Sequence, residues 1–234
     1  MTSLALACLF FLGIHVVISG SPLRRAIVGA IGESTYLGAF SLLSIGGLTW
    51  VIVAYAAAHP TSNIWWTALA WLRWPGLGAM LVAVLLVVIG LTTPSPTAAG
   101  GEARLAQADA VRGVLRVSRH PFLWGVALWA ATHLALNGDA ASALLFATML
   151  ALALVGPPLI DAKRRRAFGA QWQRFAAATS SLPFAAILGG RNTLRLDEIG
   201  AWRVALALAV YALLLGGHRW CFGVSPLPGG GFAP

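Results

Sequence analysis

The chain of 234 residues is 59% hydrophobic and only 10% charged, with a mean hydropathy of +0.80 and a net charge of +9. Charged residues make up about a quarter of ordinary soluble domains, so this composition excludes that class and predicts a membrane protein. The two cysteines, Cys8 and Cys221, offer neither a disulfide framework nor metal-ligand spacing. Covalent c-type haem is excluded because the chain contains no C-x-x-C-H motif.

Six apolar stretches follow one another along the chain, and each can cross a hydrocarbon core of roughly 30 Å if it is tilted or slightly extended. They span residues 4–20, 36–58, 75–91, 121–136, 140–160 and 204–217. Backbone groups inside a bilayer must satisfy one another, and the alternation typical of a barrel strand is absent, so helices are expected. The sequence predicts an all-α bundle of about six transmembrane helices in one domain, residues 1–234.

The basic residues lie mainly on one side of this predicted topology. Fourteen of the sixteen Lys and Arg residues fall in the first, third and fifth connections, and only Arg73 and Arg219 fall on the other side. Cytoplasmic connections carry such an excess, so both termini are expected outside, in the inner membrane of a bacterium. The same pattern explains the charge of +9 through contact with membrane lipid, and no nucleic-acid partner is expected.

Shorter segments fill the connections. Trp65, Trp66, Trp71 and Trp74 are expected to form an aromatic belt at the outer interface, with a helix lying in that plane. Apolar residues recur at helical spacing over 102–117, which predicts a cytoplasmic surface helix. Residues 226–234 are expected to be a disordered tail.

Two histidines, His15 and His133, lie inside predicted spans, where a titratable side chain is a functional hypothesis by default. The simpler alternative is a histidine that only hydrogen-bonds between helices. The predicted depths differ by about 10 Å, which we expect two axial ligands of one haem to tolerate. Trp129 lies one turn before His133 and is expected to line that pocket. His59 and His218 lie at outer span ends, as interfacial histidines or alternative ligands.

One resemblance concerns the cytoplasmic side. The run from Arg119 to Gly125, then Asp161, then 168–175 resembles membrane methyltransferases of the isoprenylcysteine and phospholipid type. That resemblance implies an S-adenosylmethionine pocket around Arg119, His120, Asp161 and Trp172. The chain departs from the family pattern because Leu123 replaces a tyrosine and a single Asp161 replaces a pair of glutamates.

A resemblance to the NnrU family covers nearly the whole chain. It rests on Gly13-Ile14-His15 with 21–24, and on 118–121, 124–125, 128–130, 133–134 and 137–139. NnrU proteins are associated with nitrite and nitric oxide reduction in denitrification. They are similar to 15-cis-zeta-carotene isomerase, which binds haem b through two histidines. His15 and His133 match those positions, while Ala130 replaces a cysteine found near the ligand in the isomerase.

The resemblance implies a haem b-binding accessory, redox or nitric oxide-sensing protein, with His15 and His133 as metal ligands and with carotene-isomerase-like chemistry as an extension. Arg119, His120 and Asp161 would order the cytoplasmic mouth, and components of nitrite or nitric oxide reductase are the implied partners. The membrane methyltransferase is the first alternative. A non-enzymatic assembly factor is the second.

Overall fold

The computed structural model describes residues 1–19, 21–107 and 109–228, and within these ranges the chain is helical, without strands. One isolated antiparallel bridge joins Ile64 to Asp139. The main helices are α1 (Thr2–Gly13), α2 (Leu23–Ile31), α3 (Glu33–Ala58), α4 (Arg73–Thr92), α5 (Pro121–Leu136), α6 (Ala140–Ala178), α7 (Ala185–Leu188) and α8 (Ala201–Phe222). The π-helical segment η1 (Ile14–Ser19) extends α1.

Five of these helical stretches are long and apolar enough to cross a membrane: 2–19, 33–61, 70–92, 140–178 and 201–222. The sequence predicted about six spans. The remaining one, α5, has the predicted bounds but only 16 residues, which is about 24 Å of helix. α6 has 39 residues, so it continues well beyond an apolar core of about 30 Å.

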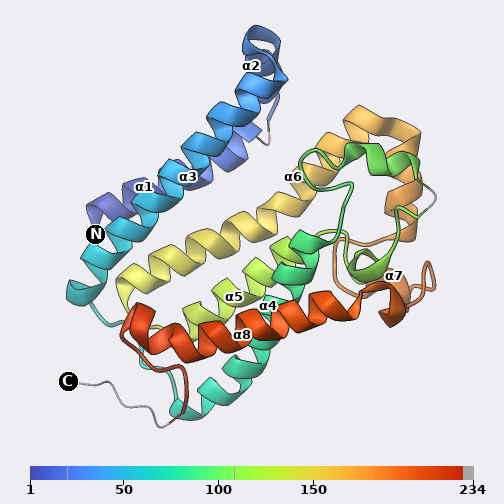
Figure 1. The fold of residues 1–234 in the computed structure, drawn as a ribbon. Coiled ribbons are helices and arrows are strands. Elements are labelled where there is room, and N and C mark those ends of the chain that lie inside the picture. Colours follow the sequence, from blue (N-terminus) through green and yellow to red (C-terminus); the bar gives the residue numbers. More distant parts are fainter. Residues whose placement is uncertain (20, 108, 229–234) are drawn as a thin grey trace.

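α6 lies between two groups of helices (Figure 1). The hairpin of α1 and α3 packs on one side of it, and α5 packs on the other, followed by α4 and then α8. Small residues allow the closest approaches. At Gly125 in α5, an added Cβ atom would lie 2.7 Å from the Ala83 carbonyl oxygen of α4. A core of buried apolar residues from α1, α3, α5 and α6 joins the two groups.

Two predicted interfacial helices are wrong. In place of a surface helix over 102–117, the chain forms short 3-10 turns, η4 (Glu102–Ala106) and η5 (Gly113–Arg116). Glu198 provides the reason, because its carboxylate accepts hydrogen bonds from the Gly113 amide at 2.8 Å and from the Arg116 guanidinium at 2.7 Å. Gly113 has a φ of 55°, which a continuous helix does not allow.

The outer connection also lacks the predicted interfacial helix. It contains a 3-10 turn, η3 (Ala70–Leu72), after an irregular segment held by hydrogen bonds from the Trp65 and Trp66 amides to the Gly138 carbonyl oxygen. Trp65, Trp71 and Trp74 are nevertheless exposed, as a belt requires. Of the predicted tail, residues 229–234 lie outside the described part of the chain.

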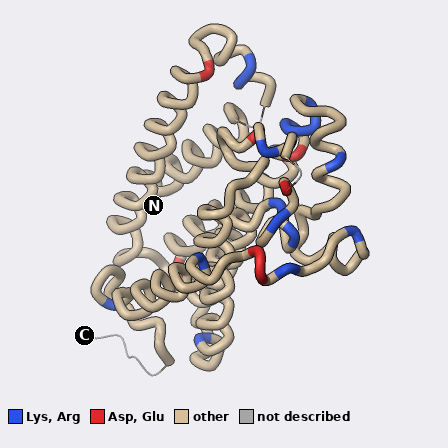
Figure 2. The backbone as a smooth tube through the Cα atoms, turned by 45° about the vertical axis from the view of Figure 1, so that its right-hand side comes forward, with Lys and Arg blue, Asp and Glu red and all other residues tan. Residues whose placement is uncertain are grey.

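Lys and Arg residues gather mainly towards one end of the helices (Figure 2). Arg24 and Arg25 of the first connection and Lys163 and Arg166 of the fifth line a single hollow. These two connections therefore lie on the same side, as the alternation of charge predicted.

Candidate functional site

His15 lies in η1 and faces the hairpin partner α3. Its Nδ1 atom donates a hydrogen bond to the Phe11 carbonyl oxygen, 2.7 Å away, and its ring contacts Phe11 and Phe40 with centroid distances of 4.4 and 5.3 Å. Because Nδ1 then holds the proton, Nε2 is left with a free lone pair. Nε2 has no hydrogen bond to any residue that the structure describes.

Two buried polar atoms of α3 flank this contact. The Tyr36 hydroxyl and the Ser44 hydroxyl lie one turn before and one turn after Phe40, and neither has a partner among the described residues. Tyr36 also stacks on Phe40, with a centroid distance of 5.8 Å. Unpartnered buried hydroxyls cost free energy, so His15 lies in a locally polar part of an apolar helix pair.

His133 forms the same kind of hydrogen bond as His15, to the carbonyl oxygen four residues earlier. Its Nδ1 atom donates to the Trp129 carbonyl oxygen at 2.9 Å, which leaves Nε2 unprotonated. The ring lies between Trp129, at 5.2 Å, and Phe146 of α6, at 4.9 Å. Trp129 therefore contacts His133, and its role in lining a haem pocket stays a prediction. Phe146 was not predicted, because only the packing of α6 on α5 selects it.

No contact joins the His15 ring to the His133 ring among the described residues. Their aromatic contacts lead to two different positions along α3. The His15 ring contacts Phe40, whereas the His133 ring contacts Phe146, which in turn contacts Tyr55 at 6.5 Å. Phe40 and Tyr55 are fifteen positions apart in one continuous helix, which is about 22 Å along its axis. The two histidines therefore reach different parts of α3, and the ligation of one haem iron by both stays a prediction.

A third histidine, His218 in α8, has the same kind of hydrogen bond, to a backbone carbonyl oxygen. Its Nδ1 atom donates to the Val224 carbonyl oxygen at 2.9 Å, so its Nε2 also keeps a free lone pair. His59 instead faces Asp139, 3.2 Å from one carboxylate oxygen, and its side chain is 44% exposed.

Arg119, His120 and Asp161 meet where α5 begins and the apolar part of α6 ends. Asp161 accepts from the Arg119 Nε atom at 2.9 Å and from the His120 Nε2 atom at 2.7 Å. His120 and Asp161 are only 3% and 8% exposed. The Arg119 guanidinium lies 5.9 Å from the ring of Trp172, which is itself buried.

Most polar groups of this cluster and its neighbours form hydrogen bonds within the protein. Ser118, next to the cluster, donates to the Ser181 carbonyl oxygen at 2.6 Å, and the Trp124 indole donates to the same oxygen at 2.7 Å. The Trp172 Nε1 atom is the exception, because it is buried without a partner in the described chain. The arrangement ties α5 and α6 to the segment after α6, and its acid and bases are already paired.

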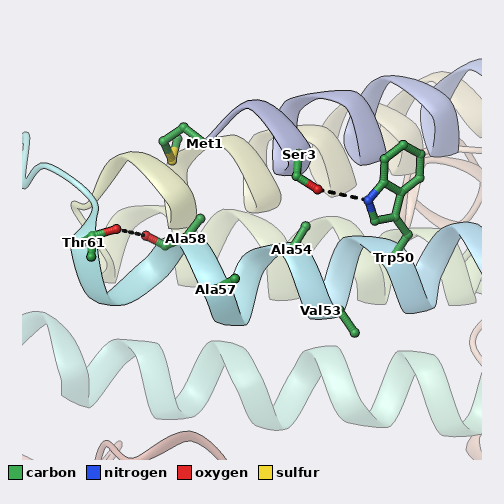
Figure 3. Close-up of a pocket in the computed structure, with 8 residues that line it drawn as sticks. All are labelled: Met1, Ser3, Trp50, Val53, Ala54, Ala57, Ala58 and Thr61. Atoms are coloured by element: carbon green, nitrogen blue, oxygen red, sulfur yellow. Dashed lines mark hydrogen bonds between the residues drawn. The ribbon is translucent and has the colours of Figure 1, made fainter.

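The hollow drawn in Figure 3 lies between the first turns of α1 and the last turns of α3 and measures about 320 Å³. Its lining consists of Met1, Ser3, Trp50, Val53, Ala54, Ala57, Ala58 and Thr61. The Trp50 indole donates to the Ser3 hydroxyl at 3.1 Å across it. None of the side chains in this lining is ionisable.

The fold and these surroundings define an all-helical membrane protein with histidines held among aromatic side chains in its apolar helices. The family model described as NnrU protein matches residues 3–226, and the chain belongs to this family. Among curated proteins, 15-cis-zeta-carotene isomerase, chloroplastic, of Arabidopsis thaliana is 29% identical over 106 residues. That alignment spans 45% of this chain and 29% of the isomerase. No solved structure matches.

Proposed function

We propose that the chain is a haem b-binding accessory protein of the bacterial inner membrane, with a redox or nitric oxide-sensing role linked to nitrite and nitric oxide reduction. His133 would be the main residue that holds the haem iron. The supporting observation is the state of this residue, since a ligating histidine typically donates its other ring N–H to a backbone carbonyl. The Trp129 carbonyl oxygen fills that role at 2.9 Å.

His218 is the second ligand in this proposal, in place of His15. Its Nδ1 atom bonds to the Val224 carbonyl oxygen at 2.9 Å, so Nε2 is the nitrogen available to a metal. The chain's own contribution is to fix the tautomer of His133 through Trp129, and to hold apolar rings of Trp129 and Phe146 against it. A haem held there would supply one-electron redox chemistry and a metal to which nitric oxide can bind.

Carotene-isomerase-like chemistry is a second candidate, favoured by the aligned 106 residues of the plant isomerase. It uses the same histidines, so an assay with 15-cis-zeta-carotene on the purified protein tests it directly. The methyltransferase alternative receives less support, because Asp161 already occupies Arg119 and His120.

The test is an absorbance spectrum of the purified protein, oxidised and reduced with dithionite, for the wild type and for His133→Ala, His218→Ala and His15→Ala. His59→Ala is the matched control, because that side chain is exposed and faces Asp139. We expect a Soret band with sharp reduced α and β bands that is lost in His133→Ala and altered in His218→Ala, and unchanged in the control.

Two outcomes overturn the proposal at different levels. A band lost in His15→Ala and His133→Ala but unchanged in His218→Ala would restore the pair predicted from sequence, and would require the α1–α3 hairpin to move on α6. A folded, colourless wild type under full haem supply would exclude haem. The assembly-factor alternative, in which both histidines only bond between helices, would then remain.

A further inference from the structure

A hollow of about 250 Å³ opens where α2 faces the charged half of α6. Its lining consists of Ser19, Ser21, Pro22, Arg24, Arg25, Lys163, Arg166 and Ala167, and we call it the basic hollow. Ser19, Ser21 and Pro22 precede α2. Lys163, Arg166 and Ala167 lie just past the apolar part of α6. The basic hollow is therefore at the level where the apolar helices end.

Three of its four cations have no directly paired carboxylate among the described residues. The side chains of Arg25, Lys163 and Arg166 make no hydrogen bond or ion pair with any described residue. Arg24 pairs with the exposed carboxylate of Glu33 and stacks over Tyr36 at 4.9 Å. Burial and the nearby Arg24 and Arg164 guanidinium groups lower the pKa of Lys163, and the more weakly acting Glu33 and Glu102 carboxylates do not cancel this effect. Like charges gathered in this way repel one another, and an anion between them removes that repulsion.

Elsewhere on this side the chain supplies its own carboxylates. Arg116 pairs with Glu198, Arg119 with Asp161, and Arg164 with Glu102. The basic hollow differs from these sites because its lining contains no acidic residue. General enrichment of basic residues on one side of a membrane explains their number, but it does not explain their convergence on one hollow.

The surfaces next to the basic hollow are apolar. Val155 and Leu159 lie on the same face of α6 as Lys163, at spacings of eight and four residues, and Val155 is exposed. On the facing side, Val17 of η1 is 58% exposed. A ligand placed here meets cations at one end and exposed aliphatic side chains at the other.

We propose that the basic hollow binds the phosphate headgroup of an anionic phospholipid, whose acyl chains lie along Val155 and Leu159. The cations neutralise the phosphate, and the aliphatic surfaces select a lipid over a free anion. Bound between α2 and α6, the lipid joins the α1–α3 hairpin to the rest of the bundle on its charged side.

The test measures binding of phosphatidylglycerol, phosphatidylcholine and inorganic phosphate to the detergent-purified full chain, by native mass spectrometry and by the shift in melting temperature. We expect phosphatidylglycerol to bind most tightly. The double variant Lys163→Gln, Arg166→Gln should weaken it roughly 30-fold, given the usual contribution of each basic residue near an anionic surface.

The matched control is Arg165→Gln, Arg174→Gln, which removes the same charge from exposed positions of the same helix outside the basic hollow. It should change the affinity less than about threefold. Equal weakening in both double variants would overturn the proposal, as would inorganic phosphate protecting as well as the lipid. If the first variant fails to fold, equal binding of the two lipids by the wild type overturns it independently. Haem content should be the same in all variants, which separates this outcome from that of the haem proposal.

Discussion

His120 and Asp161 are 41 residues apart in the sequence, yet the His120 Nε2 atom lies 2.7 Å from a carboxylate oxygen of Asp161. Because the same carboxylate also accepts two hydrogen bonds from the Arg119 Nε atom, one acidic group holds two neighbouring bases at the start of α5. The contact fixes α5 against α6 at the end of their apolar region. Its role is therefore first structural, and it sets the position from which α5 carries His133.

Asp161→Asn should lower the free energy of unfolding by roughly 3 kcal/mol or more, because it leaves the half-buried Arg119 charge uncompensated. Unfolding of the detergent-solubilised protein in a denaturing surfactant measures this. Asp109→Asn is the control, since Asp109 and Arg112 form an exposed pair that should contribute less than about 1 kcal/mol. Equal effects of the two substitutions would show that the cluster at Asp161 does not stabilise the helix contact.

The ionised Glu198 carboxylate makes the free energy of unfolding depend on pH. Hydrogen bonds from Arg116 lower its pKa, burial raises it, and the bond from the Gly113 amide contributes to a final value of about 2. A carboxyl group whose pKa is lower in the folded state stabilises the fold above its unfolded value of about 4.3. We expect the stability difference between wild type and Glu198→Gln to be complete at neutral pH.

That difference should shrink as the pH falls from about 4.3 towards 2, where the folded protein also takes up the proton. Thermal unfolding of both proteins between pH 3 and pH 7 measures the trend. A constant difference over this range would contradict the assigned ion pair.

Asp139 begins α6 as its N-cap. One carboxylate oxygen accepts from the Ser142 amide at 2.9 Å and from the Ser62 hydroxyl at 2.7 Å. Burial raises the pKa of Asp139, but these bonds and the one from His59 outweigh it and lower the pKa to about 2. Asp139→Ala should cost about 1–2 kcal/mol of unfolding free energy, whereas Asp139→Asn keeps a capping oxygen and should cost much less. Similar losses for both substitutions would exclude the cap as the cause.

Gly125→Ala should loosen the contact between α4 and α5. The new methyl group would lie 2.7 Å from the Ala83 carbonyl oxygen and 2.9 Å from the Val87 amide nitrogen, and both are backbone atoms. We expect a loss of about 1–3 kcal/mol in unfolding free energy. Gly78→Ala in α4 meets nothing within 4 Å and serves as the control, with an unchanged or slightly higher stability.

Chemical labelling of Cys221 tests the predicted membrane topology. It is exposed at the end of α8, whereas Cys8 is buried. A membrane-impermeant maleimide added to intact spheroplasts should label Cys221 if the carboxyl terminus lies outside. Arg165→Cys in a Cys221→Ser background should react only in inverted vesicles. Labelling of the two positions from the same side would contradict the predicted arrangement.

The sequence by itself determined the membrane class, the positions of the apolar helices and the family. These properties are local, because hydropathy acts on each helix separately and the family motifs are short. The bounds of α5 were predicted residue for residue, since Pro121 begins it and the Asn137-Gly138-Asp139 turn ends it. The resemblance to membrane methyltransferases also indicated that Arg119, His120 and Asp161 belong to one cluster.

Only the tertiary structure decided how deep each side chain lies relative to side chains of other helices. The sequence places His15 and His133 within their own spans, but their separation depends on the tilt and sliding of α1 against α6. The helix expected over 102–117 failed for a related reason, because Glu198, far along the chain, binds the Gly113 amide. The basic hollow likewise exists only because α2 faces the charged part of α6. Contacts between distant segments depend on packing, which no local pattern in the sequence encodes.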